Sequence, residues 1–475
     1  MALPLQMLSA SELYSSQTEN TRIATASTST KWTDFAATSF EGGEGTETSP
    51  YLIKTAEQLA KVAKDVADNT TNYAGTYFKL VSDINLEGHD WYPIGHFYSV
   101  EESNVQNGFS GIFDGDGHKI ENLTITPLAN FKSIGLFGET ASGFELRNLT
   151  IESGTIEGEM VTGALVGSNN GIIENCVNKA NVTCVYYYVG GIAGSNSREA
   201  SIKHCSNWGK ISAGQPGTNG MSAGGIVGTS YSTIEECANF ADIETATAGG
   251  AGIVGLMEGG TIRNCINRGN ISGPERTGGI AADILGRGGN CEIYNCYSTG
   301  EINSPSTAGG VVGFAMFQNF NTLKIQNLYY SSDSFSGSAY GSITDIMGQF
   351  DIIDAPTMTS DEMKAETFVA TLNEGSESET PIWEADTMNI NDGFPVLSYM
   401  QQSENPGATT QIADNHIKVF GTDSKINVEG ANNEQMQVYT VDGRMTYSGN
   451  AHDVQTNSGL YIVRIGNNSY KIVVK

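Results

Sequence analysis

The stretch Gly190-Gly191-Ile192-Ala193-Gly194 decides the fold, because it recurs along the middle of the chain with small changes. A second recurring segment, such as Ile173-Glu174-Asn175-Cys176, lies between the copies. The other copies of the glycine-flanked stretch span residues 134–138, 163–167, 224–228, 252–255, 278–282 and 309–313. Repetition every ~30 residues, with short strands and no helix inside the unit, is typical of one coil per repeat in a parallel β-helix. We expect two to three strands per coil.

Five cysteines hold one position of the repeat, at intervals of 28 to 32 residues, and leucine holds it in flanking units. Leucine replaces cysteine only where packing is wanted, so we expect buried free thiols in place of disulfides or a metal ladder. These positions are Cys176, Cys205, Cys237, Cys265 and Cys296, with Leu123, Leu149 and Leu328.

The residue before this position is often asparagine, which tolerates left-handed backbone, so a partial asparagine ladder is expected at a coil corner. His204 and Glu236 interrupt that ladder. The paired glycines indicate another corner, where a side chain would clash or φ must be positive. An apolar residue about six positions after each cysteine marks a third strand, at Val182, Ile211, Ile243, Ile271 and Ile302.

The composition excludes several classes of function. The chain of 475 residues has 57 glycines, 11 prolines and a formal net charge of −28. Such a charge is repelled by phosphate backbones and no basic patch offsets it, so we expect no nucleic-acid partner. No apolar run reaches the ~18 residues of a membrane helix, so we expect no integral membrane segment. No intact signal peptide is visible at the start, which indicates a cytosolic protein or a trimmed mature form.

The chain divides into six parts on sequence pattern. Thr55 and Gln58 form a capping box before an amphipathic helix, which suits a cap over the first coil. Thr359 and Glu362 begin a second such helix over 363–372. The parts are a tail or linker (1–30), an N-terminal cap and first coils (31–126), β-helix repeats (127–330), a C-terminal cap (331–400), a linker (401–411) and a small β-sandwich (412–475) with a hairpin turn at Asp442-Gly443.

The Gly-Gly-Ile-Val-Gly, Asn-Cys and Gly-x-Ile units resemble the GLUG repeat of bacterial surface proteins. The segments Pro50-Tyr51-Leu52-Ile53 and Trp91-Tyr92-Pro93-Ile94-Gly95 resemble the region that precedes such repeats. The resemblance implies an all-β fold, a right-handed parallel β-helix displayed outside a bacterium. GLUG repeats also occur in IgA-cleaving metallopeptidases, but the HExxH zinc motif is absent here and every histidine is isolated.

The C-terminal part resembles the sorting domain of the Bacteroidetes type IX secretion pathway. The residues that carry this resemblance are Val441-Asp442-Gly443-Arg444, Ser458-Gly459-Leu460-Tyr461-Ile462 and a tail that ends in lysine. It implies export to the cell surface, and favours a trimmed signal peptide. We therefore expect an extracellular or outer-surface protein.

Two catalytic motifs match the sequence and fail on context. Gly250–Gly255 fits the dinucleotide-binding GxGxxG pattern, but its glycines flank a repeat strand with no helix after it. Gly220–Gly224 fits the nucleophile elbow GxSxG, but again no helix follows. Both are predicted to be parts of coils, and we expect no catalytic residue and no enzyme activity.

Two groups of residues are candidates for binding. Alternation along a strand places Tyr186 and Tyr188 on one face, and Trp208 lies in the next coil. These aromatic side chains could stack on sugar rings or form a protein hot spot. Packing against the coil exterior is the simpler interpretation of all three. A cluster of cap carboxylates could bind calcium, the one cofactor considered, although Asp-Gly pairs are ordinary turns. These are Asp83, Asp90, Asp114 and Asp116, with Glu87 beside them.

The sequence leads to one preferred function and two alternatives. The preferred one is a non-catalytic adhesin or binding scaffold that recognises glycan or protein on a host or neighbouring cell surface. The first alternative is a carbohydrate-active enzyme, because many β-helix proteins cleave polysaccharides with paired carboxylates. The second is a structural stalk without a ligand.

Overall fold

The computed structural model describes residues 30–401, with gaps at 101–102, 129, 216–221, 248, 318–320, 346–348, 354 and 377. It also describes residues 418–474, with gaps at 423–424, 430–434, 441–443, 451, 458 and 466–467. The predicted tail at 1–29, the linker at 402–411, the Asp442-Gly443 turn and Gly220-Met221 lie outside the described residues. The chain forms two compact units, 1–409 and 410–475.

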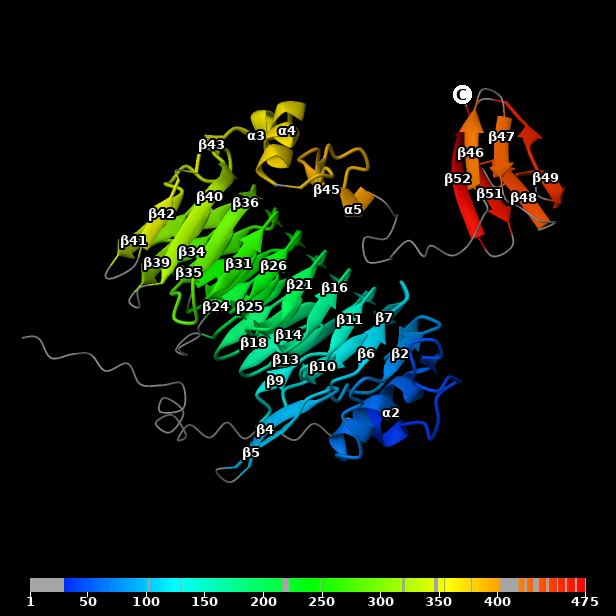
Figure 1. Cartoon of the computed structure of the whole chain (residues 1–475), viewed down its shortest axis with the longest axis horizontal. Helices are drawn as coiled ribbons and strands as arrows, with labels where there is room; N and C mark the ends of the chain where they lie inside the picture. The colour runs from blue at the N-terminus through cyan, green and yellow to red at the C-terminus, as the bar shows by residue number, and fades with distance from the viewer. Residues whose placement is uncertain are drawn as a thin grey trace, which may run out of the picture. The chain divides into compact units, whose positions relative to one another are not determined.

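The first unit is a parallel β-solenoid, as the repeat predicts (Figure 1). Each of the six coils over residues 112–284 contains five short strands in its described residues, more than the expected two to three, because the chain bends after almost every run of two to four residues. Stacking each strand on its counterpart in the next coil forms five parallel ladders. The first two ladders belong to one 19-stranded sheet, and the others form sheets of seven, seven and eight strands.

Ladder 1 consists of β1 (Tyr51–Ile53), β2 (Tyr77–Leu80), β6 (Ile112–Asp114), β11 (Glu145–Arg147), β16 (Ile172–Glu174), β21 (Ser201–Lys203), β26 (Thr233–Glu235), β31 (Gly260–Arg263), β36 (Cys291–Ser298), β40 (Thr322–Ser331) and β42 (Gln349–Ile352). Ladder 2 consists of β3 (Ile84–Asn85), β7 (Lys119–Glu121), β12 (Thr150–Ile151), β17 (Val177–Asn178), β22 (Ser206–Asn207), β27 (Ala238–Asn239), β32 (Ile266–Asn267), the second halves of β36 and β40, and β43 (Thr357–Met358).

Ladder 3 consists of β8 (Leu123–Ile125), β13 (Gly154–Gly158), β18 (Asn181–Cys184), β23 (Ile211–Ala213), β28 (Ile243–Thr245), β33 (Ile271–Ser272) and β37 (Ile302–Asn303). Ladder 4 consists of β9 (Ser133–Ile134), β14 (Val161–Gly163), β19 (Tyr188–Gly190), β24 (Ser222–Gly224), β29 (Gly249–Ala251), β34 (Thr277–Gly278) and β38 (Ala308–Gly309). Ladder 5 consists of β10 (Phe137–Glu139), β15 (Val166–Asn169), β20 (Ala193–Asn196), β25 (Val227–Ser230), β30 (Val254–Met257), β35 (Ala281–Ile284), β39 (Val312–Phe317) and β41 (Tyr340–Asp345).

The N-terminal end of the solenoid is covered as predicted. A 3₁₀ turn, η1 (Trp32–Phe35), precedes helix α2 (Ala56–Ala67), whose N-cap Thr55 accepts a hydrogen bond from Gln58 N. The apolar face of α2 joins the solenoid core through Leu59, Val62 and Val66. A hairpin of β4 (His96–Val100) and β5 (Ser103–Asn107) projects nearby (Figure 1).

The second helical segment differs from the predicted cap. It contains two helices, α3 (Ser360–Lys364) and α4 (Glu366–Gly375), because Ala365 adopts extended backbone between them. The segment continues through β44 (Trp383–Glu384), β45 (Val396–Leu397) and α5 (Ser398–Gln401). Its core packs on the outward side chains Ala238, Ile266, Tyr297 and Tyr329 of ladder 2. It therefore covers a lateral face of the solenoid, and β41, β42 and β43 form the last coil.

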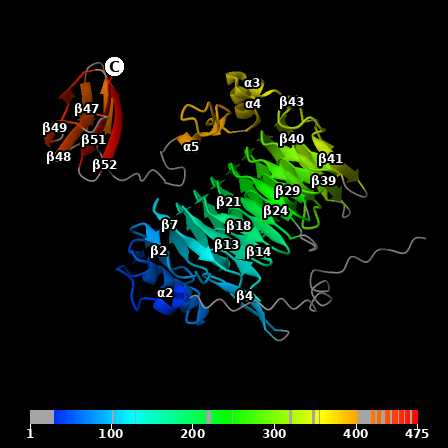
Figure 2. The same ribbon diagram turned by 180° about the vertical axis from the view of Figure 1, so that it is seen from behind.

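The second unit consists of two small antiparallel sheets with one apolar core, as the alternating pattern predicts. One sheet contains β46 (Lys418–Thr422), β47 (Lys425–Glu429) and β50 (Val454–Gln455). The other contains β48 (Gln435–Thr440), β49 (Met445–Asn450), β51 (Gly459–Ile465) and β52 (Asn468–Val474). Figure 2 shows both units from behind.

Candidate functional site

The glycines of the repeat allow neighbouring backbones to approach one another closely. The last glycine of each unit lies against ladder 4: a Cβ on Gly228 would lie 2.6 Å from Val189 N. In one coil alanine, Ala282, replaces that glycine, and there ladder 4 carries Gly249, whose own Cβ would lie 3.1 Å from the Ala282 Cβ. Gly250–Gly255 runs from β29 through a bend at residues 252–253 into β30, so a strand follows where the dinucleotide-binding motif needs a helix.

One coil corner carries the predicted ladder of left-handed residues. Seven positions, including His204 and Glu236, lie in one row and have φ between 51° and 58°. From β11 to β32 the turn between ladders 1 and 2 has the same length in each coil. We call this row the asparagine corner. The residues are Asn148, Asn175, His204, Glu236, Asn264, Asn295 and Asn327. The prediction for Asn122 and Leu123 is wrong, because Asn122 lies between β7 and β8 and Leu123 is in register with Gly154 of ladder 3.

A second asparagine ladder, which we did not predict, is fully buried. Each side-chain amide donates a hydrogen bond to the side-chain oxygen of the asparagine in the next coil. The distances are 2.8 Å from Asn178 to Asn207, 2.9 Å from Asn207 to Asn239 and 2.9 Å from Asn239 to Asn267. The second glycine of each pair packs on this ladder, so that a Cβ on Gly225 would lie 2.3 Å from Asn239 Cγ. The signal was present in the sequence as asparagine two residues after four of the five ladder cysteines, with Ser298 after Cys296.

His204 occupies a position of the asparagine corner where other coils have asparagine, and it forms an ion pair there. Its Nε2 lies 2.7 Å from Glu236 Oε2 and its Nδ1 lies 3.6 Å from Glu174 Oε1. Burial lowers the pKa of His204, but hydrogen bonds to Glu174 and Glu236 outweigh it and raise the pKa to about 9. The Tyr399 ring lies 4.7 Å from the imidazole. This packing indicates a structural role for His204, in which charge links three coils.

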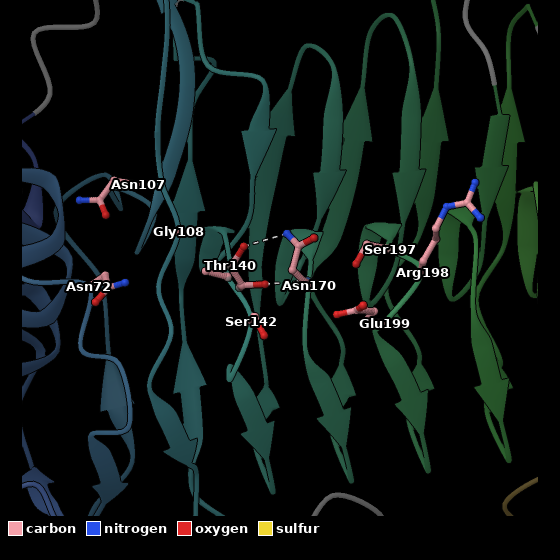
Figure 3. A pocket seen from close by; sticks show the side chains of 10 residues that line it. Asn72, Asn107, Gly108, Thr140, Ser142, Asn170, Ser197, Arg198 and Glu199 are labelled. Atoms are coloured by element: carbon pink, nitrogen blue, oxygen red, sulfur yellow. Dashed lines mark hydrogen bonds between the residues drawn. The ribbon is translucent and has the colours of Figure 1, made fainter. Parts of the chain in front are cut away.

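The corner between ladders 5 and 1 contains a pocket of about 690 Å³ (Figure 3). Asn170 lies at its centre: its backbone N–H donates to Thr140 Oγ1 at 2.8 Å and its side-chain amide donates to Thr140 O at 2.8 Å. Amide, hydroxyl and one pair of charged groups form most of the lining. The residues are Asn72, Asn107, Gly108, Thr140, Ala141, Ser142, Asn170, Ser197, Arg198 and Glu199, which we call the corner pocket.

The pocket ends at a group of aromatic and charged side chains in the next coils. The Arg198 guanidinium lies 5.7 Å from the Tyr231 ring centroid and donates to Gly288 O. Arg287 donates through Nε to Glu258 Oε2 at 3.0 Å, and the Glu258 side chain is only 3% exposed. Tyr231 is 37% exposed, so an aromatic ring lies open to solvent beside the pocket.

The three aromatic candidates do not form one patch. Tyr186 is exposed but lies in the bend between β18 and β19, so strand alternation does not pair it with Tyr188. Tyr188 begins β19 and is partly buried, and burial raises the pKa of its hydroxyl. Trp208 lies at a different corner, between ladders 2 and 3, where its indole stacks on Phe240 at 4.0 Å. Tyr188 lies near the aromatic and charged side chains at the end of the corner pocket, since Tyr231, Glu258 and Arg287 act on its pKa.

The four calcium candidates have different neighbours. Asp83 accepts from Lys119 N at 3.0 Å, and Asp90 accepts from Thr126 Oγ1 at 2.7 Å. Arg147 Nε donates to Asp114 Oδ2 at 3.0 Å, and Lys79 Nζ lies 3.0 Å from Asp116 Oδ1. Within the described ranges, no group of three or more His, Cys, Asp or Glu side chains has a geometry that could hold a metal ion.

All seven cysteines are buried free thiols, as predicted for the five of the ladder. Burial raises the pKa of Cys205, Cys237 and Cys265 well above the usual value for a thiol. These thiols are packing groups, since a nucleophilic cysteine needs a lowered pKa and exposure.

Ladder 5 also contains buried carboxylates. Asp283 in β35 is 4% exposed, with Ser222 Oγ and Arg276 Nη1 each 3.5 Å from its carboxylate oxygens. Burial raises its pKa to about 6, against the opposing charge of Arg276. A carboxylate with such a perturbed pKa is a candidate for acid–base chemistry.

The fold defines the class: the protein is a parallel β-solenoid with a small antiparallel β-domain. No family model matches the chain. It is 37% identical to a provisionally named Gly-rich membrane protein of Evansella cellulosilytica, over 29% of this chain and 15% of that protein. It is 28% identical to halomucin of Haloquadratum walsbyi, over 36% of this chain and 2% of that protein. The chain thus spans a small part of these relatives' length.

A solved structure from Bacteroides ovatus, provisionally named an immunoglobulin A1 protease, is 20% identical with a TM-score of 0.45. The alignment covers 76% of this chain and 95% of that one. At this identity and TM-score the likeness carries no inference about activity. In the part of the chain that the structure describes, no helix has the length and apolarity needed to cross a bilayer.

Proposed function

We propose that this protein is an extracellular, non-catalytic binding scaffold that recognises glycan or protein on a host or neighbouring cell surface. The observation that carries this proposal is the corner between ladders 5 and 1. There the turns differ from coil to coil, and their polar and aromatic side chains form the corner pocket and the exposed Tyr231. Side chains that depart from a repeat on a rigid scaffold are where specificity is placed.

Two observations support a location outside the cell. The C-terminal unit has the small antiparallel β-fold expected from the sorting-domain resemblance. One relative is named a membrane protein, which is compatible with a place at the cell envelope. The net charge of −28 suits a hydrated protein surface in either case.

The placement of the buried carboxylates of ladder 5 supports a non-catalytic role. Glu139 and Asp283 occupy the same row of this ladder, five coils apart by register. At ~4.8 Å per coil they lie ~24 Å apart. Glycosidases need two carboxylates within about 5 to 9.5 Å, so these two cannot act as a pair.

The test is direct binding of the full chain. Labelled protein is applied to a glycan array and to a panel of extracellular matrix proteins, with the Tyr186→Ala variant in parallel. We expect saturable binding to at least one probe, and little change in the variant because Tyr186 lies in the bend between β18 and β19 and does not line the corner pocket. Inertness on both panels would contradict the proposal and favour the structural stalk.

Asp283 favours one alternative, a carbohydrate-active enzyme. Reducing-end release from neutral and acidic polysaccharides, with and without calcium, tests it. Turnover by the wild type that disappears in Asp283→Asn would replace the scaffold proposal with an enzyme. We expect no turnover in either protein.

A further inference from the structure

We propose that the corner pocket is a subsite for a neutral oligosaccharide, with Tyr231 as the aromatic surface at its end. This inference rests on the proposed binding function and names its ligand class and its location. It assigns a site that lies apart from Tyr186 and Trp208.

The lining has the chemistry that sugar hydroxyls need. Asn72, Ser142, Arg198 and Glu199 are exposed, while Thr140 is buried and hydrogen-bonded to Asn170. Amides and hydroxyls donate and accept, so they can satisfy both functions of a sugar hydroxyl. The adjacent Arg198 and Glu199 add one charge of each sign, so the lining carries no net charge at neutral pH.

The pocket is positioned rigidly. Thr140, Asn170 and Ser197 begin the turns after β10, β15 and β20, in three successive coils. The coils are tied together at this corner because Ser197 N donates to Asn169 O at 3.0 Å and Thr140 N donates to Ser168 O at 3.1 Å. Polar groups therefore repeat along the solenoid axis at ~4.8 Å, a spacing that suits an extended chain better than a compact small molecule. Figure 3 shows this row from Thr140 to Arg198.

Other ligand classes fit less well. A protein interface has an apolar centre with a polar rim, whereas polar side chains provide most of this lining. A nucleic acid or sulfated glycan would face a chain with a net charge of −28, and only one arginine lies in the pocket. A neutral glycan satisfies the lining and can stack on the half-open Tyr231 ring.

Two pocket variants and one matched control test the site. Arg198→Ala/Glu199→Ala removes one charge of each sign from the pocket. Lys210→Ala/Glu244→Ala removes another exposed pair of opposite charge, with an N–O distance of 2.7 Å, from the residue before β23 and from β28. Ser142→Trp places a large side chain in the pocket from an exposed position. Circular dichroism confirms that each full-length variant folds.

The probes are neutral hexose and N-acetylhexosamine oligosaccharides of two to eight units, with sialylated, uronic and sulfated oligosaccharides as the charged arm. We expect the wild type to bind neutral probes, at least about tenfold weaker binding in both pocket variants, and no change in the control. If a variant fails to fold, amide hydrogen exchange on the wild type replaces it. Bound neutral probe should then protect residues 140–142, 170 and 197–199.

The outcomes separate the two proposals. Neutral binding that survives both pocket variants, or protection elsewhere, overturns the site and leaves the scaffold function intact. Binding only to charged glycans or only to matrix proteins overturns the ligand class and again leaves the scaffold. Inertness toward every probe overturns both.

Discussion

Two corners of the same coil follow opposite rules. At the asparagine corner the turn between ladders 1 and 2 has two residues in each coil from β11 to β32, and the first always has positive φ. At the pocket corner, between ladders 5 and 1, the turns from β10 to β36 vary from two to six residues. The first corner lies beside the buried asparagine ladder and the cysteines, while the second opens to solvent. Close packing of a turn fixes its length, whereas a turn exposed to solvent can vary in length.

The largest loss of stability is expected from Gly225→Ala, because Gly225 packs on the buried asparagine ladder beside the asparagine corner. The new Cβ would lie 2.2 Å from Gly252 O and 2.3 Å from Asn239 Cγ, so backbone and ladder must both shift. We expect a loss of about 3 kcal/mol or more in the free energy of unfolding. Urea denaturation measures it. Gly42→Ala is the control, because its Cβ would meet only Leu52 Cδ1 at 3.7 Å.

The next effect is expected from Asn239→Ala. The substitution leaves the Asn207 amide and the Asn267 side-chain oxygen without their 2.9 Å partners at fully buried positions. Unsatisfied buried polar groups cost about 1–3 kcal/mol each, so we expect a loss of about 2–4 kcal/mol. The exposed Asn303→Ala serves as control. Equal losses in the two variants would mean that the ladder adds nothing to stability.

His204 gives the asparagine corner a pH dependence. Its folded pKa of about 9 lies above the usual 6.5, so its stabilising effect is complete below pH 6.5 and is lost as pH rises through 9. Glu174, Glu236, Lys203 and Tyr399 face this group. We expect a loss of about 2 kcal/mol between pH 6.5 and 10.

His204→Asn restores the common residue of the corner and provides the comparison. Urea midpoints measured across that pH range should fall less in the variant than in the wild type. Parallel curves would show that other groups, such as the many tyrosines, carry the alkaline loss.

The smallest effect is expected at the pocket corner. Glu199→Ala removes an exposed side chain from a turn whose length is not constrained by a ladder. We expect a change within about 0.5 kcal/mol in the free energy of unfolding. A loss above about 1 kcal/mol would show that this corner, too, is built for packing.

The sequence predicted the features of the packed asparagine corner well and those of the solvent-exposed pocket corner poorly. The glycine stretch, the cysteine position and the left-handed corner each reflect a local requirement that recurs in every coil, so repetition shows it. The corner pocket arises from Asn72, Asn170 and Arg198, which share no motif and are close only because coils stack. Tyr186 and Trp208, which the sequence offered together as binding candidates, lie at different corners of the coil.

The sequence by itself determined the solenoid, its buried thiols, the N-terminal helical cap and the small terminal β-domain, because each depends on local patterns of glycine, apolar and turn residues. Only the tertiary structure decided where the second helical segment packs and which exposed side chains lie together. Those two outcomes depend on contacts between distant residues, such as Phe368 with Tyr329 and Arg198 with Tyr231. Periodicity does not encode such contacts, since it records only what every coil shares.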